Sequence, residues 1–213
     1  MKKTLLVALL GLFTSTAWSQ YDADAKRVLD AMSAKYKKIP AYVADISSSL
    51  INETDGINEE FKGKISVKGE MFRLELDEQV VINNGTTVWT YLPDVNEVNI
   101  DNYDPDEEEM SPSKIYDAYK EGYKYILLGE QMVNGKLSSE VDLVPNDTDS
   151  QFFKIKLFIS KADNSLQSWT MFDKSGNKYK YGIQNFKAST NSQDADFEFN
   201  ASDYPGVEII DLR

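Results

Sequence analysis

An alternation of apolar and polar residues with a period of two, in short segments joined by tight turns, most constrains how this chain can fold. Residues 61–68 (FKGKISVK) place apolar side chains on one face and mostly lysines on the other. Residues 71–77 (MFRLELD) alternate in the same way, and Gly69-Glu70 between them forms a two-residue hairpin turn. These two segments predict an antiparallel hairpin.

The same pattern recurs along much of the chain, each time bounded by residues that favour turns. We predict further strands over 79–82, 86–92, 95–100, 153–159, 166–172 and 178–186. Successive short strands joined by tight turns make an antiparallel meander. A meander of this size curls into a barrel, or into a curved sheet whose open side must be covered.

Two segments have a helical period instead. Apolar residues from Ala25 to Ile39 recur at spacings of three and four, after a capping Asp22 or Asp24 and before Pro40. A second, short helix is expected over 112–121, because Ser111-Pro112 resembles a helix start. The expected fold class is therefore mainly β (α+β): an incomplete, strongly curved antiparallel β-barrel with helices covering its open side.

The first residues predict export from the cytoplasm. A basic start at Met1-Lys2-Lys3 precedes an apolar run over 4–13, and Ala17-Trp18-Ser19 supplies small residues for cleavage. The apolar run is shorter than the roughly 20 residues of a membrane span. We expect residues 1–19 to be a cleaved signal peptide and residues 20–213 to form a single domain in an exported compartment.

Composition excludes several classes of chemistry. The 213 residues contain no His and no Cys, so no Ser-His-Asp triad, Cys nucleophile, disulfide or Cys/His zinc site can form. The net charge is −12, whereas phosphate binding needs clustered Lys and Arg, so no nucleic-acid partner is expected. The acidic run over 104–109 does not match a calcium loop and is interpreted as a solvated loop. We expect no cofactor, no metal and no enzymatic activity, although the sequence does not exclude a carboxylate pair for glycoside hydrolysis.

The aromatic residues leave two interpretations open. The chain has 10 Phe, 12 Tyr and 3 Trp, and aromatic side chains on strands usually belong to the core. The alternative is that part of the concave face is an apolar cavity for a ligand. A curled sheet with a helical lid is a geometry in which such cavities occur.

The order of these segments resembles the LolA family, the periplasmic carriers of outer-membrane lipoproteins. The motifs that carry the resemblance are GKISVK at 63–68, MFRL at 71–74, NGTTVWTYLP at 84–93, FEF at 197–199 and PGVEI at 205–209. The resemblance implies an incomplete barrel with helices across its mouth and an apolar interior that shields acyl chains from water. It also implies a monomer in the periplasm of a Gram-negative bacterium. Its partners would be lipoprotein acyl chains, an inner-membrane lipoprotein-releasing transporter and an acceptor at the outer membrane.

The resemblance also suggests which residues bind lipid. Phe72 and Leu74 match cavity-facing positions, and Ile115, Tyr116 and Tyr119 match a lid helix. Whether the face shared by Trp89 and Tyr91 lines the cavity is left open. Met32, Met71 and Met171 suit an adaptable surface. The full set of cavity candidates is Met32, Phe72, Leu74, Leu76, Trp89, Tyr91, Ile115, Tyr116 and Tyr119.

One position departs from the family pattern. Well-studied members carry an Arg directly after the strand that matches 63–68, and this Arg latches the lid. Here Lys68 is the candidate latch, without the bidentate guanidinium of Arg. Two other functional classes remain as alternatives: a lipid- or lipoprotein-sensing regulator of the same fold, and a hydrolase that uses carboxylates.

Overall fold

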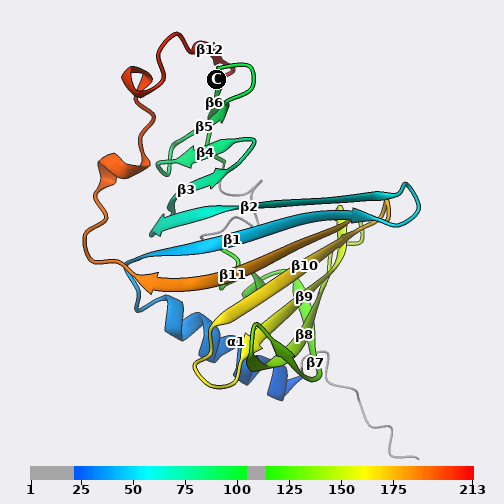
Figure 1. Ribbon diagram of the computed structural model, residues 1–213. Helices are drawn as coiled ribbons and strands as arrows, with labels where there is room; N and C mark the ends of the chain where they lie inside the picture. The colour runs from blue at the N-terminus through cyan, green and yellow to red at the C-terminus, as the bar shows by residue number, and fades with distance from the viewer. Residues whose placement is uncertain (1–21, 105–113) are drawn as a thin grey trace, which may run out of the picture.

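The computed structural model describes residues 22–104 and 114–213. In these residues it has one α-helix, α1 (Ala23–Tyr36), and twelve strands that form a single sheet (Figure 1). The strands are β1 (Ala41–Asn52), β2 (Ile57–Lys68), β3 (Met71–Leu76), β4 (Val80–Asn83), β5 (Thr87–Leu92), β6 (Glu97–Asn102), β7 (Tyr123–Val133), β8 (Lys136–Pro145), β9 (Phe152–Ser160), β10 (Leu166–Asp173), β11 (Lys178–Ala188) and β12 (Glu208–Asp211). Three 3₁₀ turns complete the described chain: η1 (Ala118–Lys120), η2 (Asp194–Phe197) and η3 (Ala201–Asp203).

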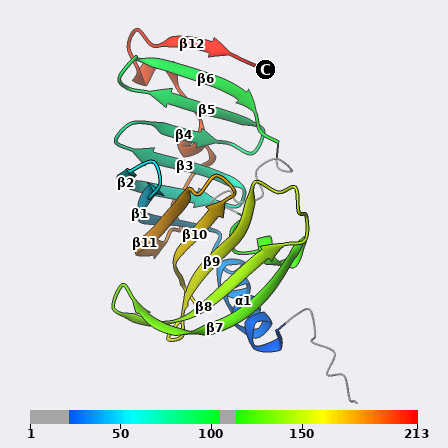
Figure 2. The same ribbon diagram turned by 90° about the vertical axis from the view of Figure 1, so that its right-hand side faces the viewer.

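The sheet is an open, curled meander. Its strand order is β12-β6-β5-β4-β3-β2-β1-β11-β10-β9-β8-β7, and neighbours are antiparallel except β12, which pairs in parallel with β6. Figure 2 shows that β7 to β11 curve around α1, while β3 to β6 and β12 extend away from it. The expected mainly β architecture with a strongly curved antiparallel sheet is therefore confirmed.

The predicted second helix is wrong. Residues 114–117 form a turn and only Ala118–Lys120 is helical, as one 3₁₀ turn; residues 112–113 lie outside the described residues. A segment this short gains too little from its own hydrogen bonds to nucleate an α-helix. Its conformation follows instead from contacts with α1, described below. The predicted signal peptide and residues 105–109 of the acidic run also lie outside the described residues.

The core lies between α1 and the concave side of the sheet. Ala25, Leu29 and Met32 are fully buried on α1, and they belong to one apolar cluster with residues of β1, β2, β3 and β7 to β11. The spacing of these three residues is the apolar stripe expected of an amphipathic helix. Within the described residues, no helix has both the length and the apolarity that crossing a membrane requires.

Three buried apolar residues lie apart from this core. Ile82, Val98 and Phe197 are fully buried but do not belong to the cluster under α1. The C-terminal segment that carries η2 and η3 runs along β3 to β6 before β12 closes the edge (Figure 1). The two sides of the sheet are thus covered by different parts of the chain.

Candidate functional site

The site is the side of the sheet that faces α1, here called the concave face. Strand register identifies its residues, because directly paired residues point to the same side. Ile65 pairs with Ala44 and Leu74, and Leu74 pairs with Val81, so this face runs continuously across β1 to β4. It continues across β11, where Ile46 pairs with Ile183.

The N-terminal end of α1 is fixed to the edge strand β7 by one carboxylate. Asp22 Oδ1 accepts hydrogen bonds from the backbone N–H groups of Asp24 (2.8 Å) and Ala25 (3.2 Å), which caps the helix. Its Oδ2 accepts from Leu127 N of β7 at 3.0 Å. The hydrogen bond from Leu127 N has the largest effect on the pKa of Asp22 and lowers it, and the two cap bonds lower it further.

The C-terminal end of α1 is held by an aromatic group that we call the tyrosine cluster: Tyr36, Tyr42, Tyr116 and Phe186. Tyr36 and Tyr116 stack with ring centroids 3.5 Å apart, and the hydroxyls of Tyr42 and Tyr116 are 3.0 Å apart. The Tyr36 hydroxyl accepts from Leu166 N at 3.1 Å. Burial raises the pKa of Tyr36 to about 12 and raises the pKa of Tyr116 as well, so both remain neutral.

Polar contacts join α1 to the segment over 114–120, and we call them the clasp. The Asp117 carboxylate accepts from Ser33 on α1 and pairs with Lys37 (3.2 Å), which caps the end of α1. The Tyr119 hydroxyl donates to Asp30 on α1 at 2.7 Å. Burial opposes ionisation of Asp117, but hydrogen bonds from Lys120, Ser33 and Lys37 outweigh it and lower its pKa. The contacts that hold this segment to the helix therefore include charged ones.

These contacts fill the space that the sequence suggested as an empty apolar cavity. Met32, Ile115 and Tyr119 are buried in the cluster under α1 rather than lining a void. A cavity of about 280 Å³ lies beside the tyrosine cluster, between the end of α1 and the β2–β3 turn. Its lining mixes Tyr36, Tyr42 and Val67 with Lys37 and Asp117, so it is not purely apolar.

Farther from α1, the concave face carries apolar residues that are only half-buried. We call this set the apolar rim. Register places Phe61 opposite Ser48, Leu76 opposite Gly63 and Tyr179 opposite Leu50, all on the concave face. The apolar rim consists of Leu50, Phe61, Leu74, Leu76, Val81, Tyr179 and Tyr181.

The nine sequence candidates do not form one lining. Phe72, Leu74 and Leu76 lie on the concave face. The core cluster that covers this face contains four further candidates: Met32, Ile115, Tyr116 and Tyr119. Trp89 pairs with Ile82 and Tyr91 with Val80, positions that alternate with those facing α1, so both point to the opposite side. Tyr91 there packs on Tyr204 of the C-terminal segment, with ring centroids 4.4 Å apart. Trp89 and Tyr91 therefore do not share a face with the other seven candidates.

Lys68, the candidate latch, contacts the C-terminal segment. Its ammonium donates to the backbone oxygen of Ser192 at 3.0 Å and to Asp194 at 2.6 Å, both in the C-terminal segment. Lys68 follows the concave-facing Val67, so it points to the other side of β2. The contacts that do hold α1, namely the clasp and the Tyr36–Tyr116 stack, were not predicted. The only hint of them was the helical spacing of Tyr116 and Tyr119.

Within residues 22–104 and 114–213, no group of three or more His, Cys, Asp and Glu side chains could hold a metal ion.

Comparison with known proteins gives matches over most of the chain. The family model described as outer membrane lipoprotein carrier protein LolA matches residues 49–200. An outer-membrane lipoprotein carrier protein of Pseudomonas paraeruginosa is 26% identical over 98% of this chain and 97% of its own. One from Photorhabdus laumondii is 22% identical over the full length of both. An uncharacterized conserved protein from Thermus thermophilus has a similar fold, with a TM-score of 0.58 at 15% identity over 88% of this chain and 99% of its own.

Proposed function

We propose, because this chain belongs to the LolA family of outer membrane lipoprotein carrier proteins, that its concave face binds the acyl chains of lipoproteins. The observation that carries the proposal is the apolar rim, a set of half-buried apolar residues on the concave face beside the core cluster under α1. Each acyl CH₂ removed from water contributes roughly 0.8 kcal/mol, so such a surface can hold a long chain without any specific polar group.

Room for whole acyl chains requires α1 and the 114–120 segment to move. Their apolar residues occupy the interior. The clasp that holds them together combines ion pairs of the partly exposed Asp117 with hydrogen bonds of the buried Ser33 and Tyr119. Exposed ion pairs contribute little to stability, typically below about 1 kcal/mol each. We infer that acyl chains replace the buried side chains of α1 and 114–120 as these elements open outward.

The carrier role extends this binding to transport. In this proposal residues 1–19 direct export, and residues 20–213 act as a single domain in the periplasm of a Gram-negative bacterium. The protein accepts lipoproteins from an inner-membrane lipoprotein-releasing transporter and delivers them to an acceptor at the outer membrane. An acidic surface suits this shuttle, because it disfavours adhesion to anionic membranes between encounters.

The test is formation of a soluble complex with a lipoprotein. The purified protein is mixed with a lipoprotein in detergent, the detergent is diluted, and the mixture is separated by size exclusion. We expect the lipidated form to co-elute with the protein and the same lipoprotein without its acyl chains to elute alone. Co-elution of neither form, or of both equally, would refute acyl-chain binding.

A regulator that senses lipids or lipoproteins remains the second candidate, because the same face would bind the same ligand. Transfer distinguishes the two. A carrier hands its bound lipoprotein to outer-membrane vesicles, whereas a sensor retains it and changes its affinity for a protein partner.

A further inference from the structure

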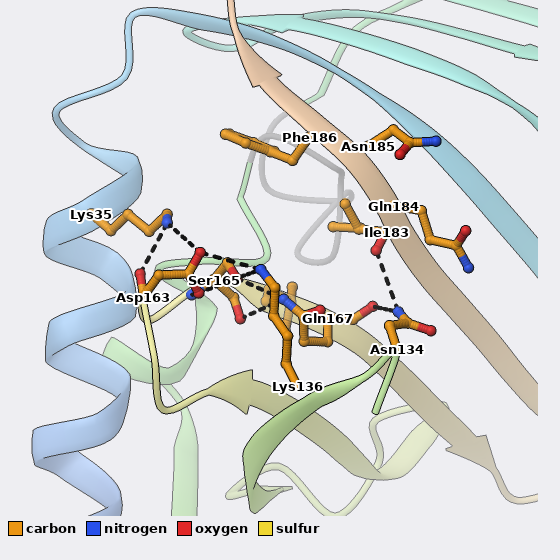
Figure 3. A pocket seen from close by; sticks show the side chains of 11 residues that line it. Lys35, Asn134, Lys136, Asp163, Ser165, Gln167, Ile183, Gln184, Asn185 and Phe186 are labelled. Atoms are coloured by element: carbon orange, nitrogen blue, oxygen red, sulfur yellow. Dashed lines mark hydrogen bonds and ion pairs between the residues drawn. The ribbon is translucent and has the colours of Figure 1, made fainter. Parts of the chain in front are cut away.

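A polar cleft of about 470 Å³ lies beside the concave face. It is formed by the end of α1, the β7–β8 turn, the β9–β10 turn and strand β11 (Figure 3). Cavities of this size hold small ligands or short pieces of polymer. The contacts within the tyrosine cluster, the clasp and the core do not use its polar lining.

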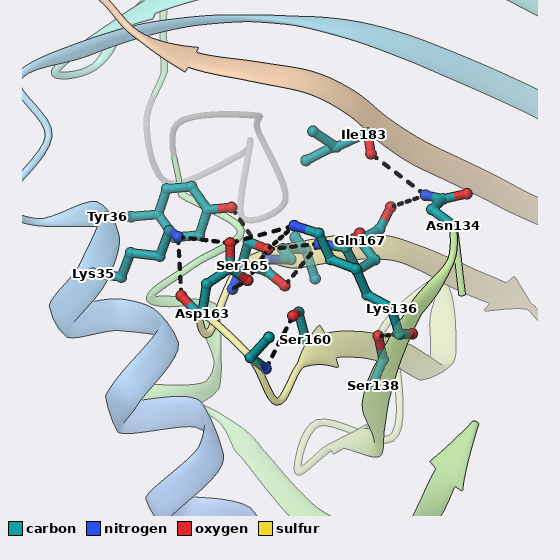
Figure 4. Close-up of polar contacts among 12 residues, drawn as sticks. Lys35, Tyr36, Asn134, Lys136, Ser138, Ser160, Asp163, Ser165, Gln167 and Ile183 are labelled. Carbon is teal, nitrogen blue, oxygen red and sulfur yellow. Dashed lines mark hydrogen bonds and ion pairs between the residues drawn. The ribbon is translucent and has the colours of Figure 1, made fainter. Parts of the chain in front are cut away.

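The cleft is locally positive in an acidic protein. Lys35 and Lys136 lie on either side of Asp163, 3.4 Å and 3.3 Å from its carboxylate (Figure 4). Two lysines and one aspartate leave a charge of +1, against −12 for the whole chain. Lys136 has the weaker attachment, because its other contact, with Ser165 Oγ, is 3.5 Å long and its side chain is 44% exposed. Its ammonium can therefore donate a hydrogen bond to one further anionic partner without breaking a short hydrogen bond.

The rest of the polar lining comes from β11 and the β7–β8 turn. Gln184 pairs with Asp45, which alternates with the concave-facing Ile46, and the Asn185 amide donates to Asp45 at 2.6 Å, so both side chains point to the other side of the sheet. Asn134 reaches over from the β7–β8 turn and donates to the backbone oxygens of Gln167 (3.4 Å) and Ile183 (3.5 Å). This contact sets the cleft wall opposite α1 (Figure 3).

The floor of the cleft belongs to the apolar interior. Leu166 and Ile183 line the cleft and are also members of the core cluster, and Phe186 is shared with the tyrosine cluster. A molecule with its acyl chains under α1 and a polar chain attached to them would therefore leave the interior through this cleft.

We propose that the cleft binds the polar polypeptide next to the acylated end of the lipoprotein, and that Lys136 pairs with a carboxylate side chain in that polypeptide. This proposal rests on the proposed function and names the part of the lipoprotein that a second subsite, the cleft, binds. A sugar is disfavoured because the Phe186 ring already packs against Tyr36 and Tyr42, with centroids 5.6 Å and 4.8 Å away. A phosphate dianion is disfavoured because Asp163 stands between the two lysines.

The test uses synthetic lipopeptides that share one palmitoylated cysteine and differ only in an eight-residue polar tail, rich in Glu, Gln or Lys. Dissociation constants are measured by calorimetry at low salt, with palmitamide as the uncharged probe that has no tail. We expect the wild-type protein to bind the Glu tail about threefold to fivefold more tightly than the Gln tail, the range of a partly exposed ion pair. Lys136→Gln should remove this preference and leave palmitamide binding unchanged.

The matched control is Lys124→Gln, which removes the same charge from an exposed position of β7 outside the cleft. It should keep the preference for the Glu tail. Equal binding of the Glu and Gln tails by the wild-type protein, or a preference that survives Lys136→Gln, would overturn the cleft proposal while palmitamide binding still supports the proposed function. Failure of palmitamide and of all three lipopeptides to bind would instead refute the proposed function.

A crosslink identifies the occupant directly. The chain has no Cys, so Lys35→Cys, on the α1 side of the cleft, provides a unique site for a benzophenone maleimide and keeps Lys136. Irradiation of the loaded protein should join the label to the peptide tail. Labelling of phospholipid in mixed vesicles, with no label on the tail, would replace the polypeptide by a lipid headgroup and overturn the proposal.

Discussion

The ring of Tyr36 lies on the ring of Tyr116, with centroids 3.5 Å apart and planes inclined by only 14°. One ring ends α1 and the other belongs to the segment just before η1, so the stack joins the two elements that occupy the interior. Opening of the concave face in the proposed function must separate this pair.

Tyr116→Ala should loosen that junction. Removing a buried aromatic ring should lower the free energy of unfolding by about 3 kcal/mol, measured by urea denaturation. Tyr116→Phe is the control, because it keeps the stack and loses the hydroxyl contacts with Tyr42 and Tyr36, a change of about 1 kcal/mol. Equal losses in the two variants would show that the stack contributes little.

Asp117→Asn should weaken the clasp without disturbing the core. It removes the charge that Lys37 and Lys120 face, and we expect a loss of about 1 kcal/mol in stability. If the clasp holds the interior closed, the same variant should take up a fluorescent fatty acid faster in stopped flow. An unchanged uptake rate would show that opening does not pass through the clasp.

Stability should be nearly flat between about pH 5.5 and 9, because the chain has no His. Below this range the stability depends on carboxylates, because the pKa values of Asp22, Asp30 and Asp117 are lowered in the folded state. The unfolded chain binds protons first, so stability falls as the pH drops below about 4.

At alkaline pH the stability depends on tyrosine, and it falls as the pH rises rather than as the pH drops. The pKa of Tyr36 is raised to about 12 by burial, above the value of about 10 in an unfolded chain. The folded state then holds its proton more tightly, so stability should fall as the pH rises from about 10 to 12. Urea midpoints across the full pH range check both limbs, and a transition near pH 6.5 would contradict the assignment.

Gly63→Ala should prevent normal pairing of β2 with β3. A Cβ at this position would lie 1.8 Å from the backbone oxygen of Glu75, which only a shift of the backbone can relieve. We expect a loss of about 3 kcal/mol or failure to fold. Gly129→Ala is the matched control on β7, where a Cβ meets nothing within 4 Å, and it should fold normally. Circular dichroism and thermal melting separate the two outcomes.

Local patterns predicted most strand positions but not how the sheet is covered. The β2–β3 hairpin followed from alternation and the Gly69-Glu70 turn, and the β4–β5 hairpin from its Asn-Gly turn. Strand β1 was missed because Ser47, Ser48 and Ser49 interrupt its apolar alternation. Its pairing with β11, more than 120 residues away, supplies what local sequence lacks.

Alternation also shows which residues share a face, but not which face is covered by which element. Trp89 and Tyr91 were correctly placed together, yet they face the C-terminal segment rather than α1. Lys68 was singled out by its position after a strand, but its partners, Ser192 and Asp194, lie more than 120 residues away. Long-range contacts of this kind leave no periodic signal.

Leu76→Glu should reduce acyl-chain binding while the protein remains folded. Leu76 lies on the concave face in the apolar rim and is only half-buried, so a carboxylate there can stay hydrated in the free protein. A bound acyl chain would bury that charge without a partner, which is unfavourable. We expect at least a tenfold loss of affinity for palmitate, measured by calorimetry, with the urea midpoint shifted only slightly. Val95→Glu is the control, because it adds the same charge at a 62% exposed position in the β5–β6 turn and should bind as the wild-type protein does. Wild-type affinity in Leu76→Glu would place the acyl chains elsewhere and remove the observation on which the proposed function rests.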